Sequence, residues 1–217
     1  MRVNYQREME AVVASLADAR PTLLLQCCCA PCSSAVLEVL CAHFQVTVYF
    51  YNPNIHPQSE YEKRLAQFDK LLPAAPFAGD VRRLAADYDP AAFFGAVRGL
   101  ESEPEGGARC TECFRLRLLE TAKKARELGF AFFTTTLTVS PHKDAAVLNE
   151  LGKTVGEAVG VRFLPSDFKK KEGYKRSIAL SKAYGLYRQD YCGCVFSRRE
   201  GAGAAISGAG GGNFDKP

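Results

Sequence analysis

The chain has 217 residues, of which 47% are hydrophobic and 24% are charged, and its formal net charge at pH 7 is +4. These values are typical of one globular domain and exclude a largely disordered or collagen-like chain. No apolar run approaches the ~18 residues of a membrane span, and no apolar signal segment follows the N-terminus, so we expect a cytoplasmic protein without a membrane partner.

Predicted helices and strands alternate along the chain. Helical periodicity and apolar runs predict helices over residues 4–19, 35–43, 59–71, 110–128 and 144–159, and strands over residues 22–26, 45–52, 130–136 and 161–164. Residues 73–107 contain only short strand and helix pieces. This alternation predicts an α/β fold in which a parallel sheet lies between two layers of helices.

The predicted domain organisation has three parts. We expect an N-terminal helical extension over residues 1–21, a single α/β catalytic domain over residues 22–200, and a disordered glycine-rich tail over residues 201–217. Parallel sheets of this kind bind ligands at the carboxyl ends of their strands. The chemistry is therefore expected in the loops that follow the predicted strands.

Nine cysteines are present, and thiols of a cytosolic protein more often bind metal or do redox chemistry than form a disulfide scaffold. They form three clusters, with Cys41 standing alone as an expected small buried hydrophobe. No single cluster supplies all four thiolate ligands of one metal site, so we expect cysteines from different clusters to bind the same metal centre. Zinc and a four-iron four-sulfur cluster both fit this ligand count. The clusters are Cys27, Cys28, Cys29 and Cys32, then Cys110 and Cys113, then Cys192 and Cys194.

Two of these groups allow a further interpretation. A single glycine between Cys192 and Cys194 lets the sulfurs approach in a strained, easily reduced disulfide, which suits a reversible two-electron store. Metal ligation and passive burial are the alternatives. Cys32 stands near a helix start, where the helix dipole lowers a thiol pKa, so it is a candidate ligand, nucleophile or cap neighbour.

Polar side chains follow two of the predicted strands. Asn52, Asn54 and His56 occupy a proline-containing loop, and Thr135 and Ser140 belong to a hydroxyl-rich segment. We expect these five residues to contact substrate. Polar loop ends of a parallel sheet would look similar without any ligand.

The positive charge is concentrated late in the chain. Residues 161–200 contain ten Lys or Arg against four Asp or Glu, a net +6, which leaves −2 for the rest. Cations interleaved with tyrosines suit phosphate contacts and base stacking, although a solvated surface or helix packing would also explain them. The candidates for substrate contact are Lys169, Lys170, Lys171 and Arg188. No glycine lies between Leu25 and Ser34, which excludes a glycine-rich phosphate loop at the first strand.

Five motifs in order resemble the QueH-type epoxyqueuosine reductase family over residues 22–197: CCAPC, YNPNIHP, RCTECFRLRLLETAKKA, FTTTLTVSPHKD and FLPSDFKKKEGYKRSIALSKAYGLYRQDYCGCVFS. The resemblance implies a HUP-like (adenine nucleotide α-hydrolase-like) fold, a Rossmann-like domain of three layers. It also implies reduction of the epoxide of epoxyqueuosine at the tRNA wobble position to an alkene, the last step of queuosine biosynthesis. The tRNA is then the partner, together with an electron donor that no flavin or nicotinamide motif identifies.

The same resemblance implies the site residues. Four cysteines match the ligands of a [4Fe-4S] cluster, and two match a redox-active pair; these are Cys28, Cys29, Cys110 and Cys113, and then Cys192 and Cys194. A second, mononuclear iron is also implied, with Cys32 or the Cys192 and Cys194 pair as its ligands. The sequence departs from the family at Cys27, a third consecutive cysteine, and at Gln26, where a histidine is common.

Removing the epoxide oxygen as water needs two electrons and two protons, whereas an iron–sulfur cluster passes one electron at a time. A thiol pair or a second metal would complete the count, and Asp167 or a tyrosine is the candidate proton donor. Two other functions fit the cysteines: a thiol–disulfide oxidoreductase that uses Cys192 and Cys194 without iron, and a zinc-stapled RNA-binding module without turnover.

Overall fold

The computed structural model describes residues 3–197, so the predicted tail at residues 201–217 lies outside the described part of the chain. No helix in this part is both long and apolar enough to cross a bilayer. The helices are α1 (Tyr5–Ser15), α2 (Ala30–Leu40), α3 (Gln58–Leu65), α4 (Gln67–Ala74), α5 (Pro90–Ala96), α6 (Ala108–Glu127), α7 (Ala145–Val159) and α8 (Gly173–Ala183), and the strands are β1 (Thr22–Gln26), β2 (Gln45–Tyr49), β3 (Arg82–Leu84), β4 (Phe132–Thr135) and β5 (Arg162–Phe163).

The five strands form one parallel sheet in the order β3-β2-β1-β4-β5. Strand β1 is central, and its Leu24 lies beside Thr47 of β2 and Phe133 of β4. The chain builds the sheet outward from β1 in one direction and then crosses back to build β4 and β5 on the other side. This reversal leaves a crevice beyond the carboxyl ends of β1 and β4, the place where such sheets bind ligands.

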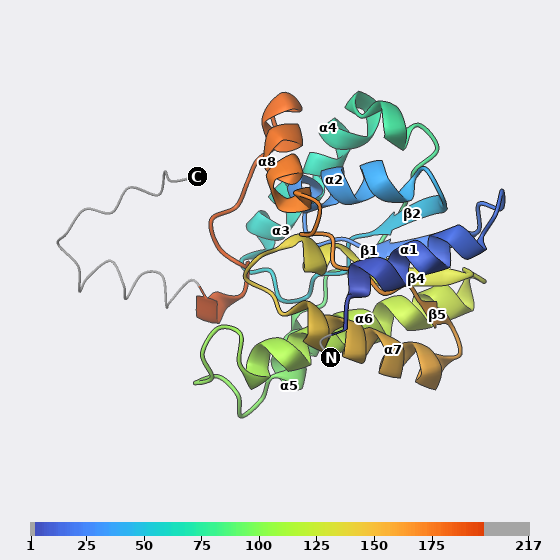
Figure 1. Ribbon diagram of the computed structural model, residues 1–217. Helices are drawn as coiled ribbons and strands as arrows, with labels where there is room; N and C mark the ends of the chain where they lie inside the picture. Colours follow the sequence, from blue (N-terminus) through green and yellow to red (C-terminus); the bar gives the residue numbers. More distant parts are fainter. Residues whose placement is uncertain (1–2, 198–217) are drawn as a thin grey trace.

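Helices cover both faces of the sheet (Figure 1). Leu23 and Leu25 of β1 face the core under α2, against which α4 and α8 pack. Leu24 points to the opposite face, where it joins the core under α6 and α7. Because successive side chains of a strand alternate between faces, a run of three buried leucines supplies both cores. The predicted parallel sheet with helices on both faces is confirmed, and the domain has three Rossmann-like layers.

Several elements differ from the sequence-based expectation, and helix α8 was not among the predicted helices. Residues 59–71, expected as one helix, form α3 and α4, which meet at Ala66. The predicted helix over residues 35–43 already begins at Ala30, because Cys29 acts as its N-cap: its backbone is extended, and its sulfur accepts a hydrogen bond from the Cys32 amide at 3.3 Å. Pro31 in the first turn has the backbone angle that a helix needs. The cysteine loop therefore runs directly into a helix.

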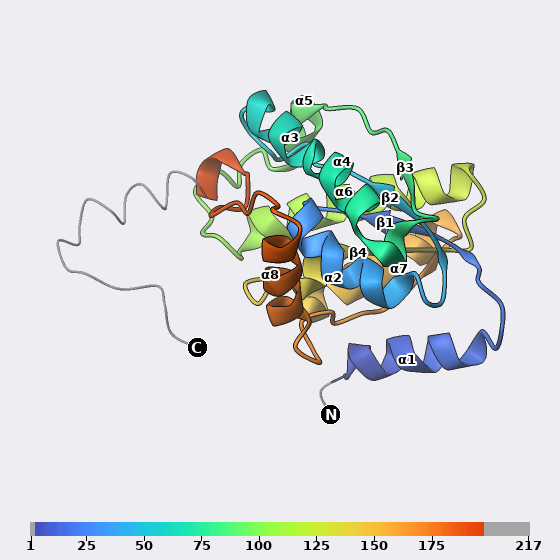
Figure 2. The ribbon, with the colours of Figure 1, turned by 90° about the horizontal axis from the view of Figure 1, so that it is seen from above.

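Helix α1 lies along the edge of the domain next to α7 (Figure 2). The Tyr5 hydroxyl donates to Glu150 of α7 at 2.9 Å, and Lys153 of α7 pairs with Glu8 at 3.1 Å. Met9 is 3% exposed and belongs to the main core. The N-terminal helix is thus packed onto the α/β domain.

Candidate functional site

A cavity of about 1290 Å³ opens at the carboxyl edge of the sheet. Its walls come from the loops after β1, β2 and β4, from α3 and α6, and from the segment that follows α8. This is the crevice that the strand order predicts. Among the residues expected to carry chemistry, those that line it are Cys28, Cys32, Asn52, Asn54, Ser140, Arg188 and Cys192.

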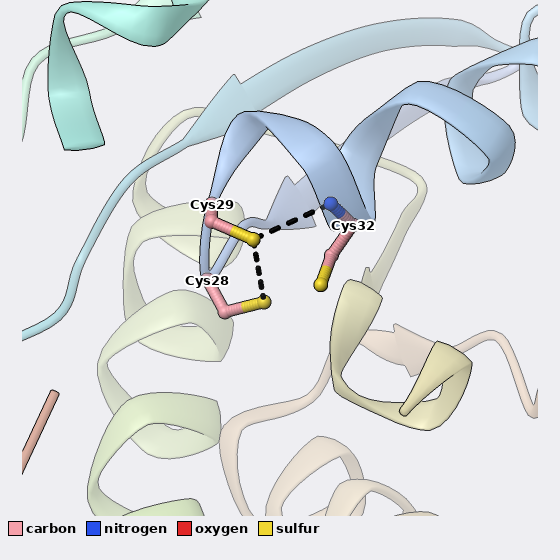
Figure 3. Close-up of side chains that lie close together, drawn as sticks. All are labelled: Cys28, Cys29 and Cys32. Atoms are coloured by element: carbon pink, nitrogen blue, oxygen red, sulfur yellow. Dashed lines mark hydrogen bonds between the residues drawn. The ribbon is translucent and has the colours of Figure 1, made fainter. Parts of the chain in front are cut away.

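Three sulfurs meet where β1 runs into α2. The Sγ atoms of Cys28, Cys29 and Cys32 all lie within 4.8 Å of one another, and those of Cys28 and Cys29 are 3.8 Å apart. Figure 3 shows the three side chains pointing toward one another at the start of the helix. Among residues 3–197, these three cysteines are the one set of three or more Cys, His, Asp or Glu side chains whose ligand atoms lie close enough together to hold a metal ion.

The three thiols differ in pKa. Hydrogen bonds from Cys29 and Cys32 hold the pKa of Cys28 well below its usual value, although burial opposes them. The same bonds raise the pKa of Cys32 well above its usual value, and burial raises that of Cys29 to about 12. The pKa of Cys32 is therefore raised, and not lowered as expected from its place near the helix start, whereas Cys28 is the thiol of the three whose pKa is lowered.

Thr136 adds to the stabilisation of that thiolate. Its hydroxyl accepts a hydrogen bond from the Cys28 amide at 3.1 Å and donates to the Cys28 sulfur at 3.4 Å. It is fully buried at the end of β4. The density of hydroxyls in this segment is visible in the sequence, but nothing in the sequence distinguishes Thr136 from its neighbours.

The other site cysteines form a second group, in which Cys192 lines the cavity and Cys110, Cys113 and Cys194 lie outside its lining. Cys113 of α6 and Cys194 are buried in a small apolar cluster, and Cys113 interacts electrostatically with Cys110, Cys192 and Cys194. Burial raises the pKa of Cys113 to about 12. All nine cysteines are free thiols. The four expected cluster ligands thus divide into two pairs, Cys28 and Cys29 beside Cys32, and Cys110 and Cys113 beside Cys192 and Cys194.

Two cations that the sequence analysis missed lie between these thiol groups. Burial alone would lower the pKa of Lys143, but electrostatic interaction with Cys192, Cys28 and Cys32 raises it above its usual value. Arg117 is 2% exposed and electrostatically favours the thiolate of Cys28. Helical spacing could have indicated Arg117, which follows Cys113 by one turn of α6. Both cations line the cavity.

The predicted substrate-contacting residues of the loops fall into two classes. Asn52, Asn54 and Ser140 line the cavity. Thr135 does not: its hydroxyl donates to Gln26 at 2.8 Å and accepts from the Leu137 amide at 3.1 Å, so it ties strand ends together. His56 also lies outside the lining; its amide donates to Gly193 at 2.8 Å.

The predicted basic surface is largely ion-paired. Lys169 binds Asp167 at 2.7 Å, and Lys171 pairs with Glu10 of α1. Lys170 is exposed. Neither these lysines nor Asp167 belong to the cavity lining, whereas Arg188 does, donating at the same time to the Ser181 hydroxyl at 3.1 Å.

Arg64 of α3 is a site residue that sequence reasoning missed. It is 2% exposed, forms a 2.7 Å ion pair with Glu60, and donates to the main-chain carbonyl groups of Tyr191 and Cys192. The guanidinium also lies over the ring of Tyr191. The segment that carries Cys192 is thereby fastened to α3, which borders the cavity.

The chain is similar to known proteins of one family over most of its length. The family model for epoxyqueuosine reductase QueH matches residues 23–200. The protein of that description from Streptococcus pyogenes serotype M1 is 45% identical over 202 residues, covering 91% of this chain and 79% of the relative. Its counterparts from Staphylococcus epidermidis and Thermotoga maritima are 42% and 40% identical, covering 90% and 82% of this chain and 85% and 91% of the relatives. The chain therefore belongs to the epoxyqueuosine reductase QueH family.

Proposed function

We propose that this chain reduces epoxyqueuosine at the tRNA wobble position to queuosine, using an iron–sulfur cluster and the cysteine pair Cys192 and Cys194. The observation that carries the proposal is that Cys28 and Cys32 of the first thiol group and Cys192 of the second line one cavity in a chain of this family. The substrate is a tRNA, so the proposal includes a cytoplasmic location.

The residues present fit a cluster of net negative charge. Cys28 has a lowered thiol pKa, and two cations, Arg117 and Lys143, border the thiols and offset negative charge. Cys28, Cys29, Cys110 and Cys113 would hold the [4Fe-4S] cluster, and Cys32 would be available to a second, mononuclear iron. When bound, such iron centres supply single electrons and a Lewis acid for the epoxide oxygen.

The thiol pair can supply the electrons and protons that epoxide reduction consumes. Converting an epoxide to an alkene and water consumes two electrons and two protons. Oxidation of the Cys192 and Cys194 thiols to a disulfide releases the same number of each. An external electron donor, a thiol or a reduced redox protein, then restores the dithiol for the next turnover. Asp167 stays a predicted proton donor.

The other residues of the site bind and orient the substrate. Asn54, Ser140 and Arg188 border the cavity, which is wide enough for a nucleotide and its neighbours. The lysines Lys169, Lys170 and Lys171 are proposed to contact the phosphates of the anticodon stem from outside the cavity. In this role they add affinity without reading sequence.

Anaerobically purified protein tests the proposal. We expect about four irons and four sulfides per chain, a brown visible spectrum, and conversion of epoxyqueuosine tRNA to queuosine tRNA, measured by mass spectrometry of the digested nucleosides. Cys28→Ala should lose the chromophore, whereas Cys41→Ala, which changes a half-buried thiol outside the cavity, should keep it. Zinc without sulfide and without turnover would favour the RNA-binding module, and thiol–disulfide exchange without iron would favour the oxidoreductase.

A further inference from the structure

Three side chains on the cavity wall each present a buried polar atom without a hydrogen-bond partner among residues 3–197. They are the Oδ1 atom of Asn54, the Oε1 atom of Gln189 and the Nε atom of Arg117. Two of these atoms are acceptors and one is a donor. A buried polar atom is costly unless a partner reaches it, so whatever occupies the cavity must supply the complementary groups.

The orientation of Gln189 follows from its other contact. Its side chain interacts with the side chain of Cys29. The buried Oε1 atom has no hydrogen-bond partner among residues 3–197, so the amide nitrogen is the end that serves this contact. The Oε1 atom is therefore the end that is left for a ligand. Gln189 spans the distance between the cysteine group and the substrate space.

The other two atoms are held by the loop after β2. The Nη2 atom of Arg117 donates to Asn52 Oδ1 at 2.6 Å, which leaves Nε available. Asn54 follows two residues later and is 2% exposed. The loop is fixed on both sides of it, because the Asn52 carbonyl accepts from the Ile55 amide at 3.2 Å and the Tyr88 hydroxyl donates to the Ile55 carbonyl at 2.8 Å. These groups are preorganised.

We propose that Asn54, Gln189 and Arg117 are the specificity-determining residues that read the hydrogen-bonding edge of the substrate base. The complement of their three unpartnered atoms is an edge of the guanine type. Such an edge carries two kinds of N–H donor, the ring N–H and the exocyclic amine, beside one carbonyl acceptor. Two acceptors and one donor on the protein are its complement. This inference rests on the proposed function, because it takes a tRNA base to be the ligand.

Stacking on the same wall cannot supply this selectivity. Tyr174, Tyr187 and Tyr191 also line the cavity and can hold the plane of a base. Every base has a stackable face, so aromatic platforms tolerate all sequences. Discrimination between bases has to come from the polar edge, where a missing donor leaves a buried acceptor unpaired.

Binding of synthetic anticodon stem-loops to the anaerobically purified protein tests the inference. Three RNAs carry guanosine, inosine or adenosine at the wobble position. Inosine lacks the exocyclic amine at C2; adenosine lacks that amine and the ring N–H, and it carries an amine where guanosine has the carbonyl. Affinities are measured by fluorescence anisotropy. We expect the wild-type chain to bind the inosine RNA about tenfold more weakly than the guanosine RNA, and the adenosine RNA more weakly still.

The variants Gln189→Met and Asn54→Leu remove one acceptor each at similar volume. The variant that loses the partner of the exocyclic amine should bind guanosine and inosine RNAs equally, in a double-mutant cycle between protein and RNA. Gln189→Glu and Asn54→Asp keep an acceptor oxygen and should restore the preference, which distinguishes recognition from misfolding. Gln6→Met on α1, far from the cavity lining, is the matched control and should keep the wild-type preference.

The outcomes separate this inference from the proposed function. Equal affinity of the wild-type chain for guanosine and inosine RNAs would overturn the inference and leave the reductase proposal standing. An unchanged preference in both Gln189→Met and Asn54→Leu would overturn it in the same way. Failure to bind any of the stem-loops would overturn the inference and the tRNA part of the proposed function together.

Discussion

Arg64 of α3 donates a hydrogen bond from Nη1 to the main-chain carbonyl of Cys192, 3.1 Å away, although 128 residues separate them in the sequence. The same guanidinium forms an ion pair with Glu60 at 2.7 Å. A buried cation thus connects α3 to the turn that carries the proposed redox pair. Together with the hydrogen bond from the His56 amide to the Gly193 carbonyl at 2.8 Å, this side chain holds the turn of Cys192 at the cavity.

Replacing Arg64 should be costly. Arg64→Met leaves Glu60 and two carbonyl groups without their buried partner, and we expect the free energy of unfolding to fall by about 2–4 kcal/mol. Urea denaturation measures the loss. Arg115→Met, which breaks an exposed ion pair with Glu112, is the matched control and should cost less than about 1 kcal/mol. Equal losses in the two variants would show that the Arg64 contacts do not fasten the turn.

Gly193 should tolerate no side chain. Its φ is +105°, and a Cβ atom there would lie 2.9 Å from both Arg64 Nη1 and Ile55 Cγ1. Gly193→Ala should therefore destabilise the chain by about 1–3 kcal/mol and slow epoxide reduction. Gly99 has a φ of +82° but open space around it, so Gly99→Ala reports the backbone cost alone. A thermal unfolding midpoint that falls equally in both variants would contradict the steric argument.

The two cysteines of the proposed redox pair should be separable from the cluster. Cys192→Ser and Cys194→Ser should each retain about four irons per chain and lose multiple turnover, because a single thiol cannot form the internal disulfide. Iron analysis and nucleoside mass spectrometry measure the two properties. Wild-type turnover in either variant would make the pair dispensable. Loss of one iron beyond the cluster would instead assign them to a second metal.

The lysine-rich segment offers a test by salt dependence. Changing Lys169, Lys170, Lys171 and Lys175 together to Gln should weaken tRNA binding and flatten its dependence on salt by about one unit of slope for each lost phosphate contact. The visible spectrum should not change. Because Lys175 pairs with Glu172 as well, part of this charge is already balanced within the protein. Unchanged affinity and slope would remove this segment from the tRNA surface.

The contact between α8 and α2 should respond to acid. Arg176 binds Glu38 through two hydrogen bonds of 2.6 and 2.8 Å, and this pairing lowers the pKa of Glu38. A lowered folded-state pKa contributes stability that is present above the unfolded pKa, about 4.3, and lost as pH falls through the folded value. Glu38→Gln should thus cost less than about 1 kcal/mol near neutral pH, where the pair is partly exposed, and nothing in strong acid. A loss independent of pH would contradict this assignment.

The layers of the fold followed from local patterns. The apolar run from Leu23 to Leu25 predicts the central strand because both of its faces are buried, and the cysteines after it fall at the sheet edge for the same reason. Strand β3 escaped prediction because its sequence is Arg82-Arg83-Leu84, which has no apolar alternation. The start of α2 was missed because cysteine is not a usual N-cap residue.

The hydrogen bonds and ion pairs around the site join residues that are far apart in the sequence. Arg64 reads as an ordinary helix-surface arginine until the segment around Cys192 packs against it. The positive charge of the late segment reads as a free basic face until Glu10 and Glu38, from two earlier helices, neutralise part of it. Periodicity carries no information about such partners, so a sequence can predict the presence of a charged group but not whether it is free.

The position of β1 in the sheet constrains the order in which the chain assembles. Each pairing of the sheet is parallel, so none of them can begin as a hairpin, and Leu24 receives its neighbour Phe133 only after more than half of the chain has been made. Sheets with such non-local contacts form slowly. On the ribosome, the edge that carries Cys28 and Cys29 therefore stays incomplete until β4 emerges. A nascent N-terminal half has the thiols of Cys28, Cys29 and Cys32 but not the Thr136 and Arg117 groups that contact or stabilise Cys28.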